Sequence, residues 1–370
     1  MSGVYISYPF CAQKCSFCNF ASGVFPAAAQ SRYHARLLEE LRSHPWSWQP
    51  QTVYFGGGTP SLMPLNLLRE CLLSLPATQD LGHAATPSSL IEVTLECAPG
   101  SVTPERAAAW AACGINRISL GVQSFVLAEL RSTGRRHNAE TVRNDIRLLR
   151  DSGIDNINID LIAGLPEQTL ESWQQSLDWM ERLAPPHVSV YIFEIDHDSR
   201  LGSEILAGGA RYRANRLPDD DLTAELYERA VERLSALSLE RYEISNFALP
   251  GRESRHNLKY WQLEPYLGFG LDAHSFDGTR RWSNPDSLDL YLESPRSSDP
   301  VTTDPAEEHF FVGLRLMRGI VPSPREWTRF ALPIQKHLQT GMLVREGNRL
   351  RLSDRGVLLS NDIFQEFVHV

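Results

Sequence analysis

The sequence VYISYPFCAQKCSFC, residues 4–18, joins an apolar strand directly to three cysteines. Cys11, Cys15 and Cys18 form the pattern C-x3-C-x2-C and can converge on a metal from one loop. Thiolates are soft ligands that suit zinc or an iron–sulfur cluster, and a structural zinc site usually has four protein ligands. Two places after the last cysteine stands Phe20, which cannot be a ligand. The pattern favours a three-cysteine metal site with one position open to another molecule; a zinc site completed by a remote residue and three free thiols are the alternatives.

The sequence around this loop alternates strands with helices up to about residue 200. Short apolar strands bounded by Gly or Pro are expected at Val4–Tyr8, Thr52–Phe55, Leu90–Leu95, Arg117–Val122, Asn156–Ile162 and Val188–Ile195. Helical patterns lie between them at Ala28–Arg42, Pro64–Ser74, Pro104–Cys113, Ala139–Ser152 and Thr169–Arg182. This alternation predicts an α/β fold with a parallel sheet, and near-continuous apolar runs such as Ile159–Ile162 fit strands buried on both faces.

The alternation stops after Asp196. We expect Gly202–Arg213 to be a loop and Arg241–Phe247 to be a strand, with a polar, aromatic-rich segment following to about Asn284. An apolar stripe at helical spacing predicts one helix between the loop and the strand; its members are Leu222, Leu226, Ala230, Leu234 and Leu237.

The last seventy residues have the order of a small winged-helix module. Helices are expected at Pro305–Met317 and Pro324–Thr340, followed by a hairpin at Leu343–Leu352 and a final helix. The sequence therefore predicts a barrel domain over residues 1–200, a linking α+β region over 201–300 and a winged-helix-like domain over 301–370.

Composition excludes several classes of protein. The chain has 370 residues and a net charge of −9, from 36 basic and 45 acidic residues, which argues against broad, phosphate-driven nucleic-acid binding. No stretch approaches the roughly 20 consecutive apolar residues of a membrane helix, and no secretory signal is recognised at the N-terminus. Six cysteines, three of them clustered, indicate metal binding in a reducing compartment, so we expect a cytoplasmic protein.

Polar residues stand where several of the expected strands end. The second strand runs into Gly56-Gly57-Gly58-Thr59-Pro60, whose bare backbone can approach a ligand. Glu96 ends the third strand, Gln123 the fourth, and Asp160 lies in the fifth. Buried carboxylates and amides need partners, and active sites of parallel barrels lie at the carboxyl ends of the strands. One satisfied polar residue would be ordinary; three in succession indicate a ligand.

Together, the cysteine pattern and the strand ends resemble the radical S-adenosylmethionine (SAM) superfamily. The resemblance implies a partial (β/α)6 TIM-like barrel in which Cys11, Cys15 and Cys18 hold a [4Fe-4S] cluster. It also implies that SAM chelates the iron that lacks a cysteine and is cleaved after electron transfer from the cluster. Cys71, Cys97 and Cys113 have no such spacing.

The resemblance narrows to the oxygen-independent coproporphyrinogen oxidase group, HemN and its relatives. By motif match, the residues implied to contact SAM are Tyr5, Gly57, Gly58, Thr59, Glu96, Gln123, Arg135 and Asp160. The guanidinium of Arg135 suits the carboxylate of SAM, although its neighbour Arg136 leaves a second register open.

Two departures from HemN and one motif point to the HemW branch, whose members are regarded as heme chaperones. Phe20 replaces a further cysteine of HemN, and only ten residues precede Cys11, where HemN has a long extension. The segment His256-Asn257-Leu258-Lys259-Tyr260-Trp261 matches the H-N-x-x-Y-W motif of that branch. Imidazole ligates heme iron and aromatic rings pack against the macrocycle, so His256 is the candidate heme ligand and His274 a second one. A hydrogen-bonded core histidine is the alternative.

We therefore expect a heme chaperone on a radical SAM scaffold that binds the cluster, SAM and heme and passes heme to an acceptor hemoprotein. An active coproporphyrinogen III oxidase is the first alternative. A heme- or redox-sensing regulatory module is the second. The sequence does not separate the chaperone from the regulatory module.

Overall fold

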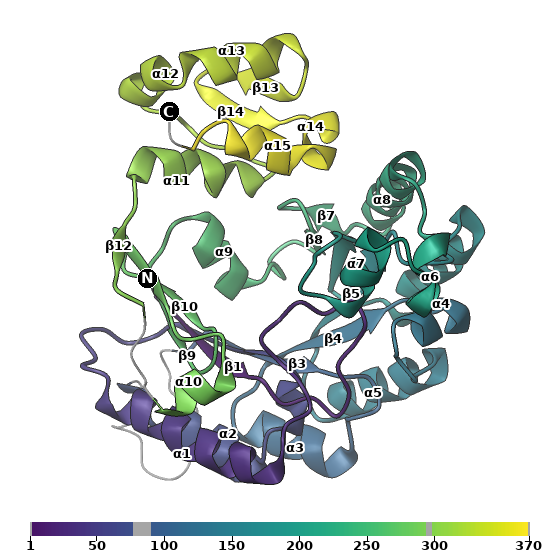
Figure 1. Cartoon of the computed structure of the whole chain (residues 1–370), viewed down its shortest axis with the longest axis vertical. Helices are drawn as coiled ribbons and strands as arrows, with labels where there is room; N and C mark the ends of the chain where they lie inside the picture. The colour runs from purple at the N-terminus through teal and green to yellow at the C-terminus, as the bar shows by residue number, and fades with distance from the viewer. Residues whose placement is uncertain (1, 77–89, 294–297, 369–370) are drawn as a thin grey trace.

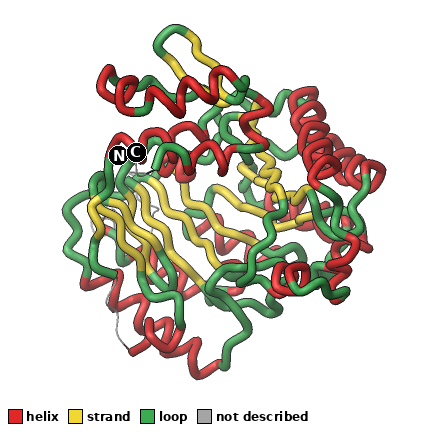
Figure 2. The backbone as a smooth tube through the Cα atoms, turned by 45° about the horizontal axis from the view of Figure 1, so that its top comes forward, coloured by secondary structure: helices red, strands yellow, loops and turns green. Residues whose placement is uncertain are grey.

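The computed structural model of the chain describes residues 2–76, 90–293 and 298–368. A curved, twelve-stranded sheet organises it (Figures 1 and 2). The central strands run parallel in chain order: β1 (Gly3–Tyr8), β2 (Thr52–Gly57), β3 (Glu92–Cys97), β4 (Arg117–Gln123), β5 (Asn156–Ala163) and β6 (His187–Ile192). β1 and β6 pair with further strands rather than with each other, so the sheet is an open arc. The predicted partial barrel is confirmed.

Helices pack on the outer face of this arc, as the sequence predicts. They are α1 (Ala27–Ser43), α2 (Leu65–Leu73), α3 (Pro104–Ala112), α4 (Leu127–Ser132), α5 (Ala139–Asp151) and α6 (Leu170–Leu183). Side-chain caps define several of their starts: Thr103 accepts from Arg106 N ahead of Pro104, and Thr169 forms a capping box with Ser172. The short α4 was not predicted, because a six-residue helix is too short to show periodicity.

The inner face of the arc carries polar side chains at positions within the expected apolar strands. Val53 and Phe55 of β2 are buried in the hydrophobic core, whereas Tyr54 between them donates a hydrogen bond to Glu96 on β3. On β5, Asn158 and Asp160 likewise interrupt the apolar residues and join a hydrogen-bonded network with Ser119. These strands are therefore apolar outward and polar inward, and β5 is largely buried on both faces, as predicted, although its inner face is polar.

Residues beyond 200 extend both edges of the sheet. β9 (Tyr266–Phe269) pairs parallel with β1, and β10 (His274–Phe276), β11 (Arg280–Ser283) and β12 (Val301–Thr302) continue outward from it. β8 (Asn246–Ala248) and β7 (Glu240–Arg241) continue from β6. The domain boundary at residue 200 remains a prediction.

Two expectations for this region were wrong. The expected loop Gly202–Arg213 overlaps helix α7 (Arg200–Leu206), capped by Ser199, and the 3-10 turn η3 (Arg211–Arg216). The expected strand Arg241–Phe247 is broken between β7 and β8, because Glu243 turns inward and accepts from Ser245 N and Asn246 Nδ2. The apolar stripe does form one helix, α8 (Asp220–Ala236). The aromatic-rich segment contains α9 (Arg255–Trp261), and α10 (Leu288–Glu293) follows it.

The C-terminal part stands above the sheet in Figure 1 and has the predicted helix–helix–hairpin order. Its elements are α11 (Pro305–Phe311), η4 (Gly313–Arg315), α12 (Pro324–Arg329), α13 (Ala331–Gln339), β13 (Leu343–Glu346), β14 (Arg349–Leu352), α14 (Asp354–Leu358) and α15 (Ser360–Gln365). The expected helix Pro305–Met317 ends at Phe311, and Pro324–Thr340 is divided at Phe330. Pro333 explains the division, because its ring excludes the hydrogen bond to residue 329 that a continuous helix needs.

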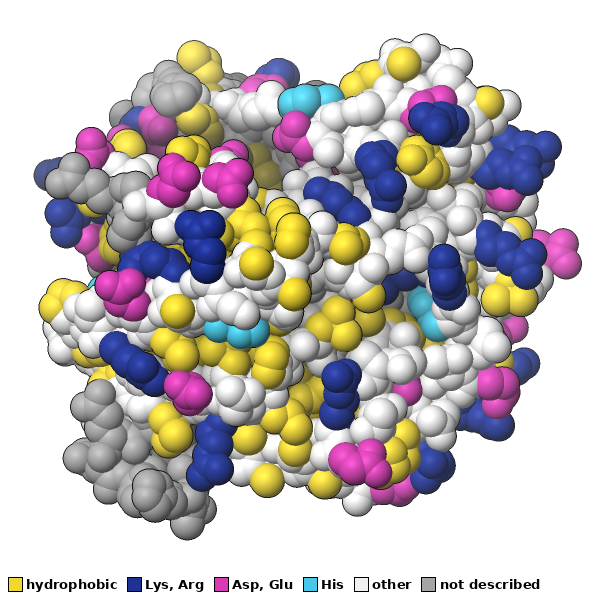
Figure 3. Space-filling view, turned by 60° about the horizontal axis from the view of Figure 1, so that its bottom comes forward, with side chains coloured by type: hydrophobic (Ala, Val, Ile, Leu, Met, Phe, Trp, Pro, Cys, Tyr) yellow, Lys and Arg dark blue, Asp and Glu magenta, His cyan; other side chains and the backbone are white. Residues whose placement is uncertain are grey.

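The outer surface agrees with the composition. On the face in Figure 3, basic and acidic side chains are interspersed rather than separated by sign. None of the helices within the described ranges has the length and apolar content that a membrane crossing requires.

Candidate functional site

A cavity of about 1170 Å³ opens at the carboxyl ends of the parallel strands, where the sequence places the chemistry. All three clustered cysteines line it. Seven of the eight residues matched to SAM contacts line it as well: Gly57, Gly58, Thr59, Glu96, Gln123, Arg135 and Asp160. The eighth, Tyr5, is not part of the cavity lining and stacks on Tyr54, with ring centroids 6.0 Å apart. The fold thus collects residues from the cysteine loop, from strands β2 to β5 and from the turn after α4.

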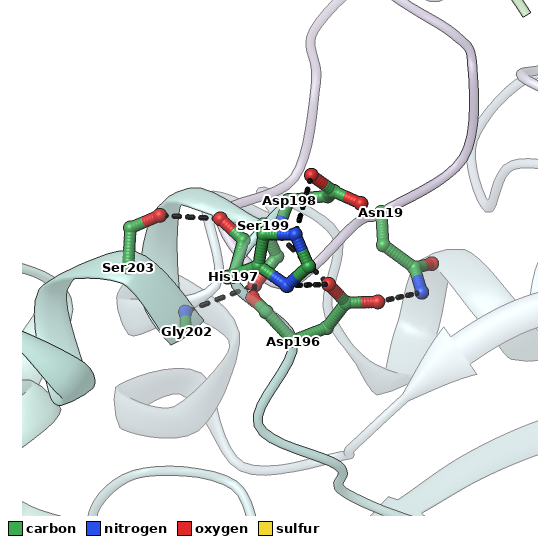
Figure 4. Close-up of polar contacts among 7 residues, drawn as sticks. All are labelled: Asn19, Asp196, His197, Asp198, Ser199, Gly202 and Ser203. Carbon is green, nitrogen blue, oxygen red and sulfur yellow. Dashed lines mark hydrogen bonds and ion pairs between the residues drawn. The ribbon is translucent and has the colours of Figure 1, made fainter.

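The cysteine loop is held between two other segments. Ser16 N donates to Thr133 O, and Leu201 N donates to Ser16 O, at 3.1 and 2.8 Å. At the end of the loop, Asn19 Nδ2 donates to Asp196 Oδ2 at 2.6 Å (Figure 4). These contacts fix the loop through residues other than cysteine, so the three thiols are left partly exposed at the cavity.

Arg135 connects the cysteine loop to the cavity floor. Burial raises the pKa of the Cys15 thiol, and the nearby positive charge of Arg135 opposes that rise. The Nε of Arg135 is buried and has no hydrogen-bond partner among the described residues. Because buried polar groups are normally paired, this orphaned donor indicates a missing acceptor at the cavity.

The glycine run packs tightly against the cysteine loop. A Cβ on Gly58 would lie 2.6 Å from the carbonyl carbon of Pro9, and Gly57 has a φ of +102°. Gly58 N donates to Tyr8 O and Thr59 N to Phe10 O, at 2.9 and 3.1 Å. The backbone of this run therefore approaches the strand and loop that lead to Cys11, and its approach to a ligand stays a prediction.

Two carboxyl groups face the cavity from β3 and β5. Glu96 accepts a hydrogen bond from Tyr54 at 3.0 Å, and burial together with the charge of Asp160 raises its pKa to about 8. Burial also raises the pKa of Asp160, although Asn158 Nδ2 donates to it at 2.7 Å. A cationic ligand beside these two carboxyl groups would stabilise their ionised forms.

Comparison with known proteins agrees with this geometry. Residues 5–180 match the Radical SAM superfamily. Heme chaperone HemW of Lactococcus lactis is 30% identical, with 99% of this chain and 97% of that protein aligned. The chain belongs to the HemW family. HemW of Escherichia coli is 33% identical over 85% of this chain and 83% of its own length.

The fold of this HemW-family chain also matches a solved structure. Coproporphyrinogen III oxidase (HemN) from Escherichia coli superimposes with a TM-score of 0.81 over 100% of this chain and 90% of that chain, at 20% identity. At this identity the match establishes the shared fold alone.

The structure does not bring His256 to the cavity. Its imidazole is fully buried beside the first residue of β2, where Nδ1 lies 2.8 Å from Thr52 Oγ1 and Nε2 lies 2.7 Å from Tyr260 OH. Burial lowers the pKa of His256 to about 3. Both ring nitrogens are occupied, and this end of β2 is opposite to the cysteines. In this conformation His256 is a core histidine, and its ligation of heme stays a prediction.

The second candidate, His274, lies on β10 with its side chain 67% exposed and 3.7 Å from Asp272. It does not line the cavity. Neither histidine singled out from the sequence is therefore placed beside the cysteines.

Sequence reasoning missed two groups of cavity residues in this HemW-family chain. His137 is the one histidine among the described residues that line the cavity; its Nε2 is buried without a partner, and burial lowers its pKa to about 4. The signal in the sequence that could have identified His137 was its position two residues after Arg135. Arg315 and residues 357–362 reach the cavity from the C-terminal part, and the sequence assigned none of them to a site.

Proposed function

We propose that this chain is a heme chaperone that binds a [4Fe-4S] cluster, SAM and heme, and passes heme to an acceptor hemoprotein. The observation that carries the proposal is the full-length similarity to HemW proteins of a chain in which the three clustered cysteines line the cavity at the strand ends. The clustered cysteines also support a reducing, cytoplasmic location.

The residues present fit the cluster. Cys11, Cys15 and Cys18 come from one loop, are partly exposed, and border a cavity that can admit a further ligand. Such a cluster, when bound, supplies an electron at low potential. Arg135 favours the thiolate form of Cys15, which is the form that binds iron.

The residues present also fit SAM, which is a cation at its sulfonium and carries an ammonium and a carboxylate. Glu96 and Asp160 offer negative charge to the cationic groups, and the unpaired donor of Arg135 offers a partner to the carboxylate. The turn at Gly57 and Gly58 holds this surface against the cysteine loop.

The pKa of Glu96 gives this placement a pH dependence. Glu96 is largely protonated at neutral pH without ligand, because its pKa is about 8. A bound cation stabilises the ionised form and lowers that pKa, so SAM binding should release a proton. Affinity should rise as the pH rises from about 6.5 to about 8.5.

Calorimetry in buffers of different ionisation enthalpy measures that proton release. Glu96→Gln should abolish both the release and the pH dependence. Release that persists in Glu96→Gln would show that another group titrates, and Glu105→Gln, an exposed residue on α3, is the matched control.

Coproporphyrinogen III oxidase is the second candidate, favoured by the fold shared with HemN. We expect the anaerobically reconstituted chain, given SAM and a reductant, to bind hemin with a Soret shift and to leave coproporphyrinogen III unchanged. The expectation rests on the similarity to HemW proteins and on Phe20 in place of the further cysteine of HemN. Product analysis with Escherichia coli HemN as the positive control separates the two functions. Stoichiometric formation of protoporphyrinogen IX would reject the chaperone.

A further inference from the structure

The cavity is larger than one small ligand requires. Its volume of about 1170 Å³ exceeds the roughly 300–1,000 Å³ that is usual for a small-molecule site. The cysteines and the proposed SAM residues that line it come from the cysteine loop, strands β2–β5 and the turn after α4. A further part of the lining, here named the distal chamber, consists of Ile192, Phe193, Ile244, Val357, Leu358 and Leu359.

The distal chamber has an apolar wall built from three separate parts of the chain. Ile192 and Phe193 follow β6, Ile244 lies in the turn between β7 and β8, and residues 357–359 end α14. Arg241 pairs with Asp354, and Asn361 Nδ2 donates to Glu194 at 3.1 Å, which holds α14 and α15 against this side of the sheet. Figure 1 shows these helices on the side of the molecule where β7 and β8 lie. Such a wall suits the flat, apolar body of a macrocycle.

A fixed positive charge lies beside the distal chamber. Arg315 lines the cavity with its guanidinium stacked 4.4 Å over Trp261 and its Nη2 3.6 Å from Glu243 Oε2. Glu243 is fully buried, and its Oε1 already accepts from Ser245 N and Asn246 Nδ2. The stacking and this ion pair set the orientation of the guanidinium. Its Nε has no partner within the described part of the chain, so Arg315 retains donors for a second carboxylate.

We propose that heme binds in the distal chamber with one propionate paired to Arg315. This inference rests on the proposed function and names the place and the chemistry of the heme site. SAM and heme would then share one cavity, with heme lying against the C-terminal helices.

The test compares two ligands in two proteins. Hemin and its dimethyl ester differ in the charge of the propionates, so their ratio of affinities reports recognition of the carboxylates. The double variant Arg315→Met/Glu243→Gln removes the charge pair together, because Arg315→Met alone would leave a buried carboxylate unpaired. The matched control is Arg351→Met/Glu346→Gln, an ion pair of 2.7 Å on the β13–β14 hairpin.

Soret titrations of the full chain should show wild type and control binding hemin about tenfold or more tightly than the diester. The double variant should bind both ligands within about twofold of each other. A wild-type preference that survives in the double variant, or a wild type without preference, would overturn the placement at Arg315. A wild type that does not bind hemin at all would reject the proposed function itself.

A second variant tests the chamber if the double variant does not fold. Leu359 is 45% exposed and lines the chamber, so Leu359→Trp can be accommodated at the surface while it narrows the space. Hemin affinity should fall about tenfold while SAM affinity is unchanged. Unchanged hemin affinity would place heme elsewhere.

Discussion

Cys15→Ala should leave the chain folded and remove its iron–sulfur cluster. Two thiolates do not retain a cubane cluster, so the reconstituted variant should lose nearly all of the roughly four irons and four sulfides per chain that we expect in the wild type. The fold should persist because Cys15→Ala leaves intact the contacts of Ser16 and Asn19 that hold the loop. Iron and sulfide analysis, visible absorbance and thermal melting measure the two effects separately.

Cys113→Ala is the matched control for this experiment. Cys113 is also partly exposed, but it ends helix α3 and does not line the cavity. Its replacement should preserve the cluster. An undiminished cluster spectrum in Cys15→Ala would remove Cys15 from the ligand set.

The parallel core of the fold could be predicted because its signals are local. Each of the central strands has six to eight residues with apolar side chains at alternate positions, and caps such as Thr103 and Thr169 start the helices between them. Most bounds agree within two residues. The strands beyond β1 escaped prediction because β9 has four residues and β10 three, too few to show alternation, and β9 is stabilised by pairing with β1, which is distant in sequence.

Motif reasoning predicted the position of most of the proposed SAM residues, but it did not predict the position of His256. Glu96, Gln123 and Asp160 lie in strands, in the half toward the carboxyl end, and this position fixes which edge of the sheet a residue joins. His256 lies in a helix that connects two distant strands. Nothing local reveals that α9 packs at the amino ends of β1 and β2, where Glu92 accepts from His256 N at 2.9 Å. The same imidazole can ligate iron or fill a core, and only its position in the fold separates the two.

The distal chamber could not be predicted from the sequence for a related reason. Arg315, Ile244 and Leu359 belong to segments to which the sequence assigns no binding role. They become one surface because the C-terminal helices pack beside the turn between β7 and β8. A site assembled from three segments over more than a hundred residues is visible only once the chain is folded.

The last prediction concerns Gly58, where fold and site depend on the same contact. Even a Cβ at this position would lie 2.6 Å from backbone Pro9, two residues before Cys11, and backbone cannot move aside as a flexible side chain can. Gly58→Val should therefore separate the glycine turn from the cysteine loop and break the bonds from Gly58 N to Tyr8 O and from Thr59 N to Phe10 O.

We expect SAM affinity in Gly58→Val to fall by about a hundredfold or more, because a displacement of about 1 Å is costly in a preorganised site. Cluster content should fall as well, since the displaced segment leads into Cys11. Gly23→Ala is the control: it lies on the same loop, and its Cβ would meet only the ring of Phe25 at 3.5 Å. Calorimetry with SAM and iron analysis test both effects. Wild-type affinity in Gly58→Val would mean that the glycine run is a turn of the fold that SAM does not approach, and the placement of SAM would then rest on Glu96, Asp160 and Arg135 alone.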